Sequence, residues 1–376
     1  MSIFMPSRLV TRVATVAALA GFAGAGAAAA AQARPFIRQF HTITTIASAV
    51  PKGGPAKGDV NPYGIVVVPR STGGLVRHDV LISNFNNSQN QQGTGSSIVE
   101  ISPTGHQHVF AVVPRPTSTP AVGLTTALAV LRSGFVIVGS LPAPGGDSSK
   151  AGPGALTILN AHGHVVGRIV APDINGPWDM TAVDRGSRAV LFVTNVLNGT
   201  VAANGKVVHR GTVVRIGLRI RHGGAPEVTS NHVIAGGLAE RTDPNALIIG
   251  PTGVGLGSNG TLYVADSVSN RIAAVPQALT RMSTLGGGGT TVATGGPVND
   301  PLGLLVAPNG NIVTANGGDG RLVETSAAGL RVANRTLVNN GGGDLFGIAL
   351  APGARGIYFV NDAGSGGAAN SLQLLH

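Results

Sequence analysis

Apolar residues in this chain occur in short runs that are separated by tight turns rich in Asn, Asp and Gly. The clearest example is residues 251–275, where the sequence PTGVGLGSNGTLYVADSVSNRIAAV holds three such runs. Asn259 and Gly260 separate the first two runs, and this pair favours a β-hairpin because both residues tolerate the positive φ angles of a type I′ turn. About fifty residues later, residues 301–325 repeat the pattern with Asn309 and Gly310 in the same place. A repeated unit of this length predicts an architecture built from β-repeats.

The order of residues within each unit is also repeated. It runs Pro-x-Gly, an aliphatic run, Asn-Gly, a second aliphatic run, Ala-Asp or Ala-Asn, a short loop, and Arg with a third aliphatic run. This order resembles the NHL repeat, in which one repeat forms one blade of a β-propeller. The resemblance implies an all-β fold. It leaves the function open, because NHL-like propellers serve as enzymes, as RNA-binding proteins and as protein-binding platforms.

Six segments of the chain open a blade of this kind, each with a short turn followed by an aliphatic strand. They lie at Asn61–Gly64, Ala121–Gly123, Gly176–Asp179, Pro251–Gly253, Pro301–Gly303 and Leu345–Gly347. Two strands without a hairpin partner remain, one at residues 35–47 and one at residues 371–376. Pairing these two strands would remove two open sheet edges. The sequence therefore predicts a six-bladed β-propeller that is closed by pairing of the N-terminal strand with the C-terminal blade.

The composition agrees with a large globular core. Of the 376 residues 43% are hydrophobic and only 11% are charged, and the 57 glycines provide for many turns. Aromatic residues make up 4% of the chain, so Val, Ile and Thr are expected to form the strands. The chain has no cysteine, which excludes disulfides and thiol chemistry.

Residues 1–33 have the pattern of a secretory signal peptide. Arg8 and Arg12 precede a long stretch rich in Ala and Gly, and Ala31-Gln32-Ala33 matches an A-x-A cleavage site. An uncleaved membrane anchor is the alternative. We expect residues 34–376 to form the propeller, to be exported to the periplasm or the extracellular space, and to contain no membrane span, because no later segment is apolar for long enough.

The formal net charge of +10 raises the question of a nucleic-acid partner. The basic residues are spread along the chain, with one local cluster at Arg215, Arg219, Arg221 and His222 on an alternating strand. A solvated strand face explains this cluster. The spread of the basic residues and the expected export both argue against nucleic acid as a partner. We also expect the protein to be a monomer.

Insertions are concentrated on one face of the predicted propeller. The loops between the second and third strands are long at residues 85–97, 141–154, 196–211 and 363–370, and they emerge on the face that carries the blade openings. We call this the long-loop face. The loops are rich in Asn, Gln, Ser, Gly and Thr, which suits a polar small molecule, a glycan or a protein as partner.

Two sets of residues are candidates for binding at this face. The first set lies at the ends of the second strands and comprises Asn84, Ser140, Asn195, Asp266, Asn316 and Asn361, with Asp362 beside the last. Such side chains either close a turn by bonding their own backbone or form a ring of amides and acids at the channel mouth. The second set is the middle residue of each opening: Tyr63, Val122, Trp178, Thr252, Leu302 and Phe346. Asp179 stands where most openings have Gly, beside the only Trp. An indole beside a carboxylate suits sugar stacking, while plugging of the channel explains the same residues.

The indications of catalysis are weaker. Some six-bladed propellers similar in outline, the gluconolactonase-like hydrolases, hold a divalent cation on the axis with Glu, Asn and Asp. Asp266, Asn195, Asn316 and Asp362 would imitate such a site, but no Glu lies at a blade opening. The pairs His106 and His108, and His162 and His164, lack a third ligand at fixed spacing.

The main prediction is therefore a non-catalytic binding module without a cofactor, with a cation on the axis left open. A metal-dependent lactonase is the alternative, and a structural protein of the cell envelope is a third interpretation.

Overall fold

The computed structural model describes Met1 and residues 34–114, 123–221, 223–339, 342–363 and 369–376. Residues 2–33 of the predicted signal peptide, Ala121, Val122 and His222 lie outside the described residues. Residues Pro35–His376 form one compact unit.

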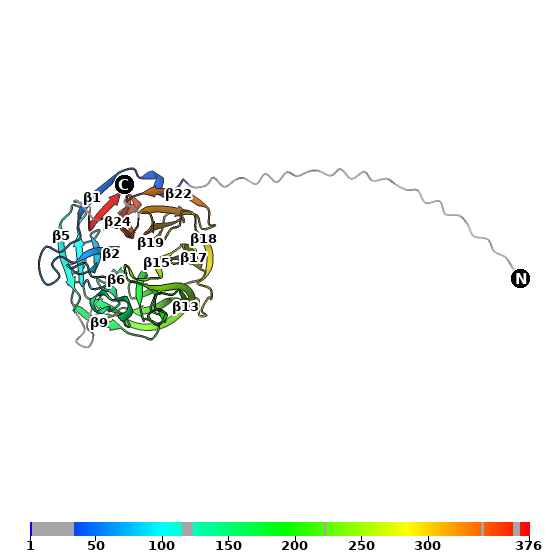
Figure 1. Ribbon diagram of the computed structural model, residues 1–376, viewed down its shortest axis with the longest axis horizontal. Helices are drawn as coiled ribbons and strands as arrows, with labels where there is room; N and C mark the ends of the chain where they lie inside the picture. The colour runs from blue at the N-terminus through cyan, green and yellow to red at the C-terminus, as the bar shows by residue number, and fades with distance from the viewer. Residues whose placement is uncertain (2–33, 115–122, 222, 340–341, 364–368) are drawn as a thin grey trace. The chain divides into compact units, whose positions relative to one another are not determined.

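Six antiparallel sheets surround a common axis, which confirms the predicted six-bladed propeller (Figure 1). Blade one contains β2 (Val60–Val67), β3 (Val80–Asn86), β4 (Ser97–Ile101) and β5 (Gln107–Val112). Blade two contains β6 (Leu124–Val130), β7 (Val136–Ser140), β8 (Ala155–Leu159) and β9 (Val165–Ile169). Blade three contains β10 (Pro177–Asp184), β11 (Arg188–Asn195), β12 (Val208–Arg219), β13 (Glu227–Asp243) and β14 (Leu247–Ile249).

The remaining blades have four strands each. Blade four contains β15 (Pro251–Leu256), β16 (Leu262–Asp266), β17 (Arg271–Val275) and β18 (Thr290–Thr294). Blade five contains β19 (Pro301–Val306), β20 (Ile312–Asn316), β21 (Arg321–Thr325) and β22 (Arg331–Thr336). Blade six contains β23 (Leu345–Leu350), β24 (Ile357–Asn361), β25 (Ser371–Leu375) and β1 (Ile43–Ser48). The described helical elements are short: η1 (Phe36–Gln39), η2 (Pro144–Gly146), η3 (Ser148–Lys150), η4 (Pro352–Ala354) and α1 (Thr200–Ala203).

The ring closes through the two ends of the described unit, as predicted. Strand β1 pairs antiparallel with β25, from Ile43 opposite Leu375 to Ser48 opposite Ser371. Figure 1 shows the blue β1 beside the red C-terminal strands. The predicted strand at residues 35–47 is shorter than expected, because its first part forms the 3₁₀ turn η1 before β1 begins at Ile43.

Every innermost strand carries a β-bulge at its opening. In blade five, Pro301 pairs with Asn316 and Leu304 with Thr314, so that β19 holds one extra residue. The pairings of the other five inner strands shift at the equivalent place. A bulge rotates the local side chains. The side chain of the middle residue of each opening therefore points in a different direction from the side chains of the strand that follows.

The glycine of the opening motif is required by the distance between neighbouring blades. A Cβ atom at Gly303 would lie 2.5 Å from the backbone oxygen of Phe346 in the next blade. Blade three differs at this point, because it has Asp179 where the motif has Gly.

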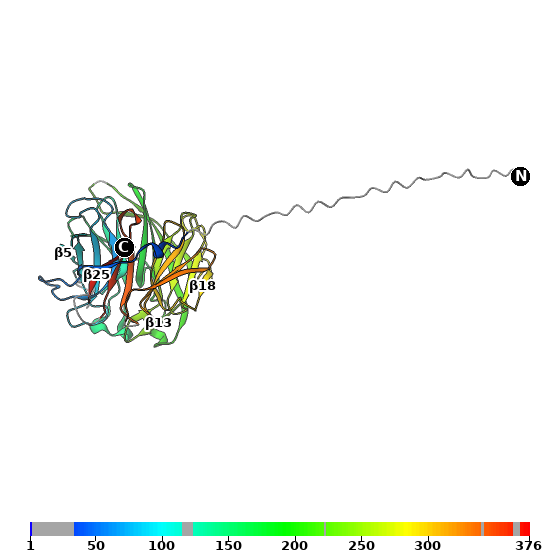
Figure 2. The same ribbon diagram turned by 90° about the horizontal axis from the view of Figure 1, so that it is seen from above.

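Blade three departs furthest from the repeat. Strands β12 and β13 are long, and the hairpin between β13 and β14 brings residues 245–249 toward the long-loop face. The side view in Figure 2 shows the strands running between the two faces that carry the loops. The predicted solvated cluster holds only in part: Arg219 and Arg221 are exposed beside Glu227, but Arg215 is buried and donates to the backbone oxygen of Ala278 at 3.2 Å.

Across the described part of the chain, no helix has both the length and the apolar character that a membrane crossing requires.

Candidate functional site

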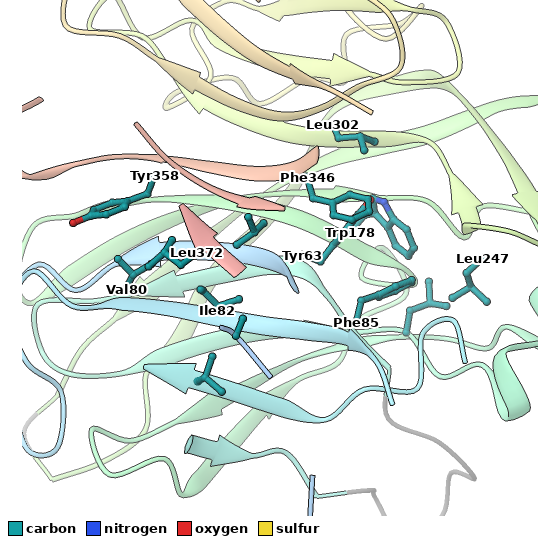
Figure 3. Packing of buried hydrophobic residues seen from close by; sticks show 14 of the residues in the cluster. Tyr63, Val80, Ile82, Phe85, Trp178, Leu247, Leu302, Phe346, Tyr358 and Leu372 are labelled. Atoms are coloured by element: carbon teal, nitrogen blue, oxygen red, sulfur yellow. The ribbon is translucent and has the colours of Figure 1, made fainter. Parts of the chain in front are cut away.

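Four aromatic side chains meet at the centre of the propeller. The Tyr63 ring lies 4.5 Å from the Phe346 ring and 5.3 Å from the Phe85 ring, measured between centroids. Trp178 meets Phe85 edge to face at 5.7 Å. Figure 3 shows the four rings together, with Leu302 nearby. The four rings are buried, and they lie between two cavities of the axial channel. We call the four rings the aromatic plug.

The first cavity lies on the long-loop face of the plug, and we call it the loop-side cavity. Its volume is about 160 Å³, and the plug residues and Leu302 form its apolar surface. Its polar lining comes from loops of several blades and consists of Asn61, Asn86, Asn90, Gln92, Asn245, Thr252, Asp300 and Asp362. Amides and two carboxyl groups around aromatic rings suit a small, polar, ring-shaped molecule.

Two carboxyl groups give this cavity its acid–base character. Burial raises the pKa of Asp362 to about 7, and the neighbouring Asp344 carboxylate adds to the rise. Burial also raises the pKa of Asp300; Arg241 acts in the opposite direction, and Asp243 reinforces the rise. A pKa near 7 is typical of a group that accepts or donates protons at neutral pH.

Hydrogen bonds within the loops hold the polar lining in place. The Asn86 side chain donates to Asn90 Oδ1 at 2.7 Å and accepts from the backbone N–H of Gly93 at 3.2 Å. The backbone N–H of Asn61 donates to Asn370 Oδ1 at 2.6 Å, and Asn61 adopts the left-handed conformation with φ of 57°. The long loop of blade one is therefore organised around the cavity.

The second cavity lies on the other side of the aromatic plug, and we call it the channel cavity. Its volume is about 370 Å³, and all six innermost strands contribute to its wall. Asp179 projects into it from β10, and burial raises the pKa of this carboxyl to about 8 although the backbone N–H of Met180 opposes the shift.

The predicted site residues are separated by the fold. Tyr63, Trp178 and Asp362 line the loop-side cavity, and Asp179 lines the channel cavity. The six positions at the ends of the second strands line neither cavity and are buried inside the blades: Asn84, Ser140, Asn195, Asp266, Asn316 and Asn361.

Hydrogen bonds hold at least three of these six side chains inside their blades. Asp266 accepts from Arg271 Nη2 at 2.8 Å within blade four. Asn84 donates to the backbone oxygen of Ala49 at 2.9 Å, and Asn316 donates to that of Pro297 at 2.6 Å. Asn361 bonds its own turn, because its side-chain oxygen accepts from the backbone N–H of Ala363 at 2.8 Å, whereas Asp266, Asn84 and Asn316 bind other segments of the chain.

Sequence reasoning did not single out several residues of the loop-side cavity. Asp300 precedes the opening proline of blade five, as Asn61 precedes that of blade one, and both have positive φ angles. A non-glycine residue at this position of the repeat was an available signal. The sequence of residues 245–249 contains no signal of this kind, because the β13–β14 hairpin is not part of the repeat.

The donor set does not fit a cation held by several carboxylates. Among the described residues, no three or more His, Cys, Asp or Glu side chains are placed to hold a metal. His106 and His108 lie with ring centroids 6.3 Å apart, and His108 approaches Glu100 at 3.4 Å in the outer part of blade one. We therefore derive no chemical step through a metal.

No protein-family model and no curated protein sequence matches this chain. Several solved structures, however, are similar to this chain. The PQQ-bound aldose sugar dehydrogenase from Streptomyces coelicolor has a TM-score of 0.53 and 14% identity, with 89% of this chain and 97% of that chain covered. The calcium-binding protein regucalcin from Agrobacterium tumefaciens has a TM-score of 0.52 and 15% identity over 88% and 95%.

A gluconolactonase from Xanthomonas campestris has a TM-score of 0.50 and 13% identity, with 87% of this chain and 98% of that chain covered. At these identities the similarity shows the fold alone. The chain is thus a six-bladed β-propeller whose structural neighbours include a gluconolactonase, a regucalcin and an aldose sugar dehydrogenase.

Proposed function

We propose that the protein is a hydrolase that opens a small, uncharged lactone in the loop-side cavity, with Asp362 as the general base. The observation that carries this proposal is the position of Asp362, which lines the cavity with its pKa raised to about 7. Two of the structural neighbours, the gluconolactonase and the sugar dehydrogenase, bear names that connect this architecture with sugar chemistry. Their names support the substrate class.

The reaction consumes one water molecule. Asp362 takes a proton from that water as the water oxygen attacks the lactone carbonyl carbon. The ring C–O bond then breaks, and the departing oxygen receives a proton from the protonated Asp362, or from Asp300, which then regains a proton from Asp362 through water. The product is a hydroxy acid. Asp300 suits the donor role because burial raises its pKa and so favours the protonated form.

The size and lining of the cavity set the substrate class. A volume of about 160 Å³ is below the roughly 300 Å³ at which typical ligand pockets begin, so a single ring fits better than a larger ligand. The aromatic plug offers apolar surface to one face of the ring, and we expect Asn90, which Asn86 holds in place, to bind the hydroxyl groups of the ring.

The test is hydrolysis of five- and six-membered sugar lactones by the purified protein. A pH-stat measures the rate of acid release, from which the rate in buffer alone is subtracted. We expect the rate to rise through about pH 7 as Asp362 ionises. Loss of a general base costs about 10²- to 10⁴-fold, so Asp362→Asn should lose at least about 100-fold. Asp147→Asn alters an exposed carboxylate paired with Lys150 outside the cavity and should behave like the natural protein. A wild-type rate equal to that in buffer, or full activity in Asp362→Asn, contradicts the proposal.

The amide-rich lining favours a second candidate, a binding module that holds the same sugar-like ligands without turnover. Calorimetric titration with the lactones and their hydroxy acids separates the two functions. Saturable binding without hydrolysis, weakened by substitution of Asn90 by Ala, would establish the binding module in place of the hydrolase.

We also propose that the protein is exported. Support comes from the A-x-A pattern at residues 31–33, which ends two residues before the compact unit begins at Pro35. N-terminal sequencing of the protein recovered from a periplasmic extract or culture medium tests this, and a chain that retains residues 1–33 in the cytoplasm contradicts it.

A further inference from the structure

The channel cavity has a wall made of the free edges of six sheets. The innermost strands β2, β6, β10, β15, β19 and β23 each stand at the end of their sheet. One edge of each therefore has no β partner among the described residues. Edge strands present unpaired backbone N–H and C=O groups, which need hydrogen-bond partners when they are not exposed to bulk water. The channel cavity therefore offers backbone acceptors, together with backbone donors, from every direction around the axis.

The side chains between these edges are almost all aliphatic. Val67, Val130, Leu256 and Val306 line the cavity, and each is the last residue of its inner strand. The cavity consequently extends to the face of the propeller opposite the long loops. The wall thus combines alkyl surface with backbone polar groups and the hydroxyl groups of Thr126 and Thr181.

Asp179 is the exception in this wall. The equivalent position is Gly in most blades, and at Gly303 a Cβ atom would approach the backbone of the next blade to 2.5 Å. Blade three has a carboxyl there, and it faces the cavity. The carboxyl is thus an addition to the repeat that the packing of blades does not require.

In the part of the chain that the structure describes, the carboxyl of Asp179 has no cationic partner. Among the described residues, Met180 donates its backbone N–H to Asp179 Oδ1 at 2.7 Å, and no Lys, Arg or His lines the cavity. Tyr63 is the other titratable side chain in the lining. Strands β6 and β15, which flank β10 on either side, have no titratable residue, and Arg188 of β11 is exposed at the far end of its strand.

We propose that the channel cavity binds a small primary alkylammonium ion, with Asp179 as its counter-ion. The ammonium group donates one hydrogen bond to the Asp179 carboxylate and the others to backbone oxygens of the strand edges. The alkyl chain contacts the aliphatic side chains toward the face opposite the long loops. This site is separate from the loop-side cavity, because the aromatic plug lies between them.

Binding should be linked to the ionisation of Asp179. Burial raises the pKa of this group to about 8, so the carboxyl is mostly neutral at pH 6.5 and mostly ionised at pH 9. The ionised fraction rises roughly 30-fold between these pH values, and we expect the affinity to rise by about the same factor. Below pH 8 each bound cation should displace one proton.

The test is calorimetric titration of the full purified protein with n-butylammonium chloride at pH 6.5, 7 and 9. At pH 7, the heats in two buffers of different ionisation enthalpy report the displaced proton. We expect Asp179→Asn and Asp179→Gly to lose binding at pH 9, the second restoring the glycine of the repeat. Asp362→Asn should bind as the natural protein does, so failure of the lactonase proposal and failure of this one remain distinct.

Three results would overturn the proposal: no binding by the natural protein at pH 9, equal affinity in Asp179→Asn, or equal affinity for the uncharged analogue n-butanol. If the Asp179 variants do not fold, as judged by circular dichroism, proton release and pH dependence in the natural protein decide the question alone.

Discussion

Glu324 Oε1 accepts a hydrogen bond from the backbone N–H of Phe36 at 2.8 Å, although 288 residues separate the two. The second carboxylate oxygen accepts from the backbone N–H of Ile37 at 2.9 Å. Arg335, also in blade five, donates to the backbone oxygens of Phe40 and His41. Blade five thus holds the segment that leads into β1, and β1 completes blade six. Closure of the ring depends on side chains of one blade as well as on strand pairing in the next.

Replacement of Glu324 by Gln should weaken this attachment. The amide keeps one acceptor but places an N–H group against a backbone donor, and hydrogen bonds to charged groups contribute about 1.5–3 kcal/mol each. We expect the free energy of unfolding to fall by about 2 kcal/mol in urea titrations. Glu227→Gln, which changes an exposed Glu beside Arg221, should leave the midpoint unchanged. Equal midpoints for both variants would show that the attachment contributes nothing.

Asp266 should act on stability and not on activity. The carboxylate is fully buried, and Arg271 binds it through Nε at 2.9 Å and Nη2 at 2.8 Å. Removal of one partner from a buried ion pair costs about 3–5 kcal/mol. Asp266→Asn should therefore lower the unfolding midpoint strongly, while the lactonase rate per folded molecule stays the same. Loss of activity in a fully folded Asp266→Asn would place this residue in the site after all.

The opening glycines should tolerate no side chain. A Cβ atom at Gly303 would lie 2.5 Å from Phe346 O, and insertion of atoms into packed regions costs about 1–3 kcal/mol. Gly303→Ala should lower the free energy of unfolding by that amount. Gly53→Ala is the matched control, because nothing lies within 4 Å of the added atom and the backbone needs no positive φ. If both variants unfold at the same urea concentration, the close approach of neighbouring blades does not require glycine.

Stability should decrease as the pH rises from about 4.5 to 7 because of Glu100. Burial and the nearby Asp79 raise its pKa to about 7, with the backbone N–H of Val76 opposing the shift. The folded state then binds more protons than the unfolded state above pH 4.5, and stability falls until the folded pKa is passed. Glu100→Gln should reduce the difference in stability between pH 5 and pH 8 by about 1–3 kcal/mol.

Thermal melts of the natural protein and of Glu100→Gln at pH 5 and pH 8 measure this difference. Glu227→Gln controls for a change in net charge, since Glu227 is exposed. Identical pH dependence in Glu100→Gln and the natural protein would show that Glu100 ionises normally.

Local sequence patterns were sufficient to predict the blades and the way they close. Asn-Gly hairpins, short aliphatic runs and the opening motif with its glycine are local signals, and local signals repeat wherever the local backbone repeats. The unpaired strands at residues 35–47 and 371–376 needed only the rule that sheet edges seek partners. For these reasons the number of blades and the pairing of β1 with β25 could be predicted from the order of residues.

Which polar side chains share a cavity was settled by contacts that form only in the folded chain. Asp266 and Asn316 occupy equivalent positions in the repeat, yet both turn into their blades, because Arg271 and the backbone of Pro297 are there to bind them. Asp300 and Asp362 meet the same cavity from different blades because the β-bulges, the β13–β14 hairpin and the aromatic plug shape the space between them. The direction of a side chain at a bulge depends on contacts between distant segments, which no local pattern contains.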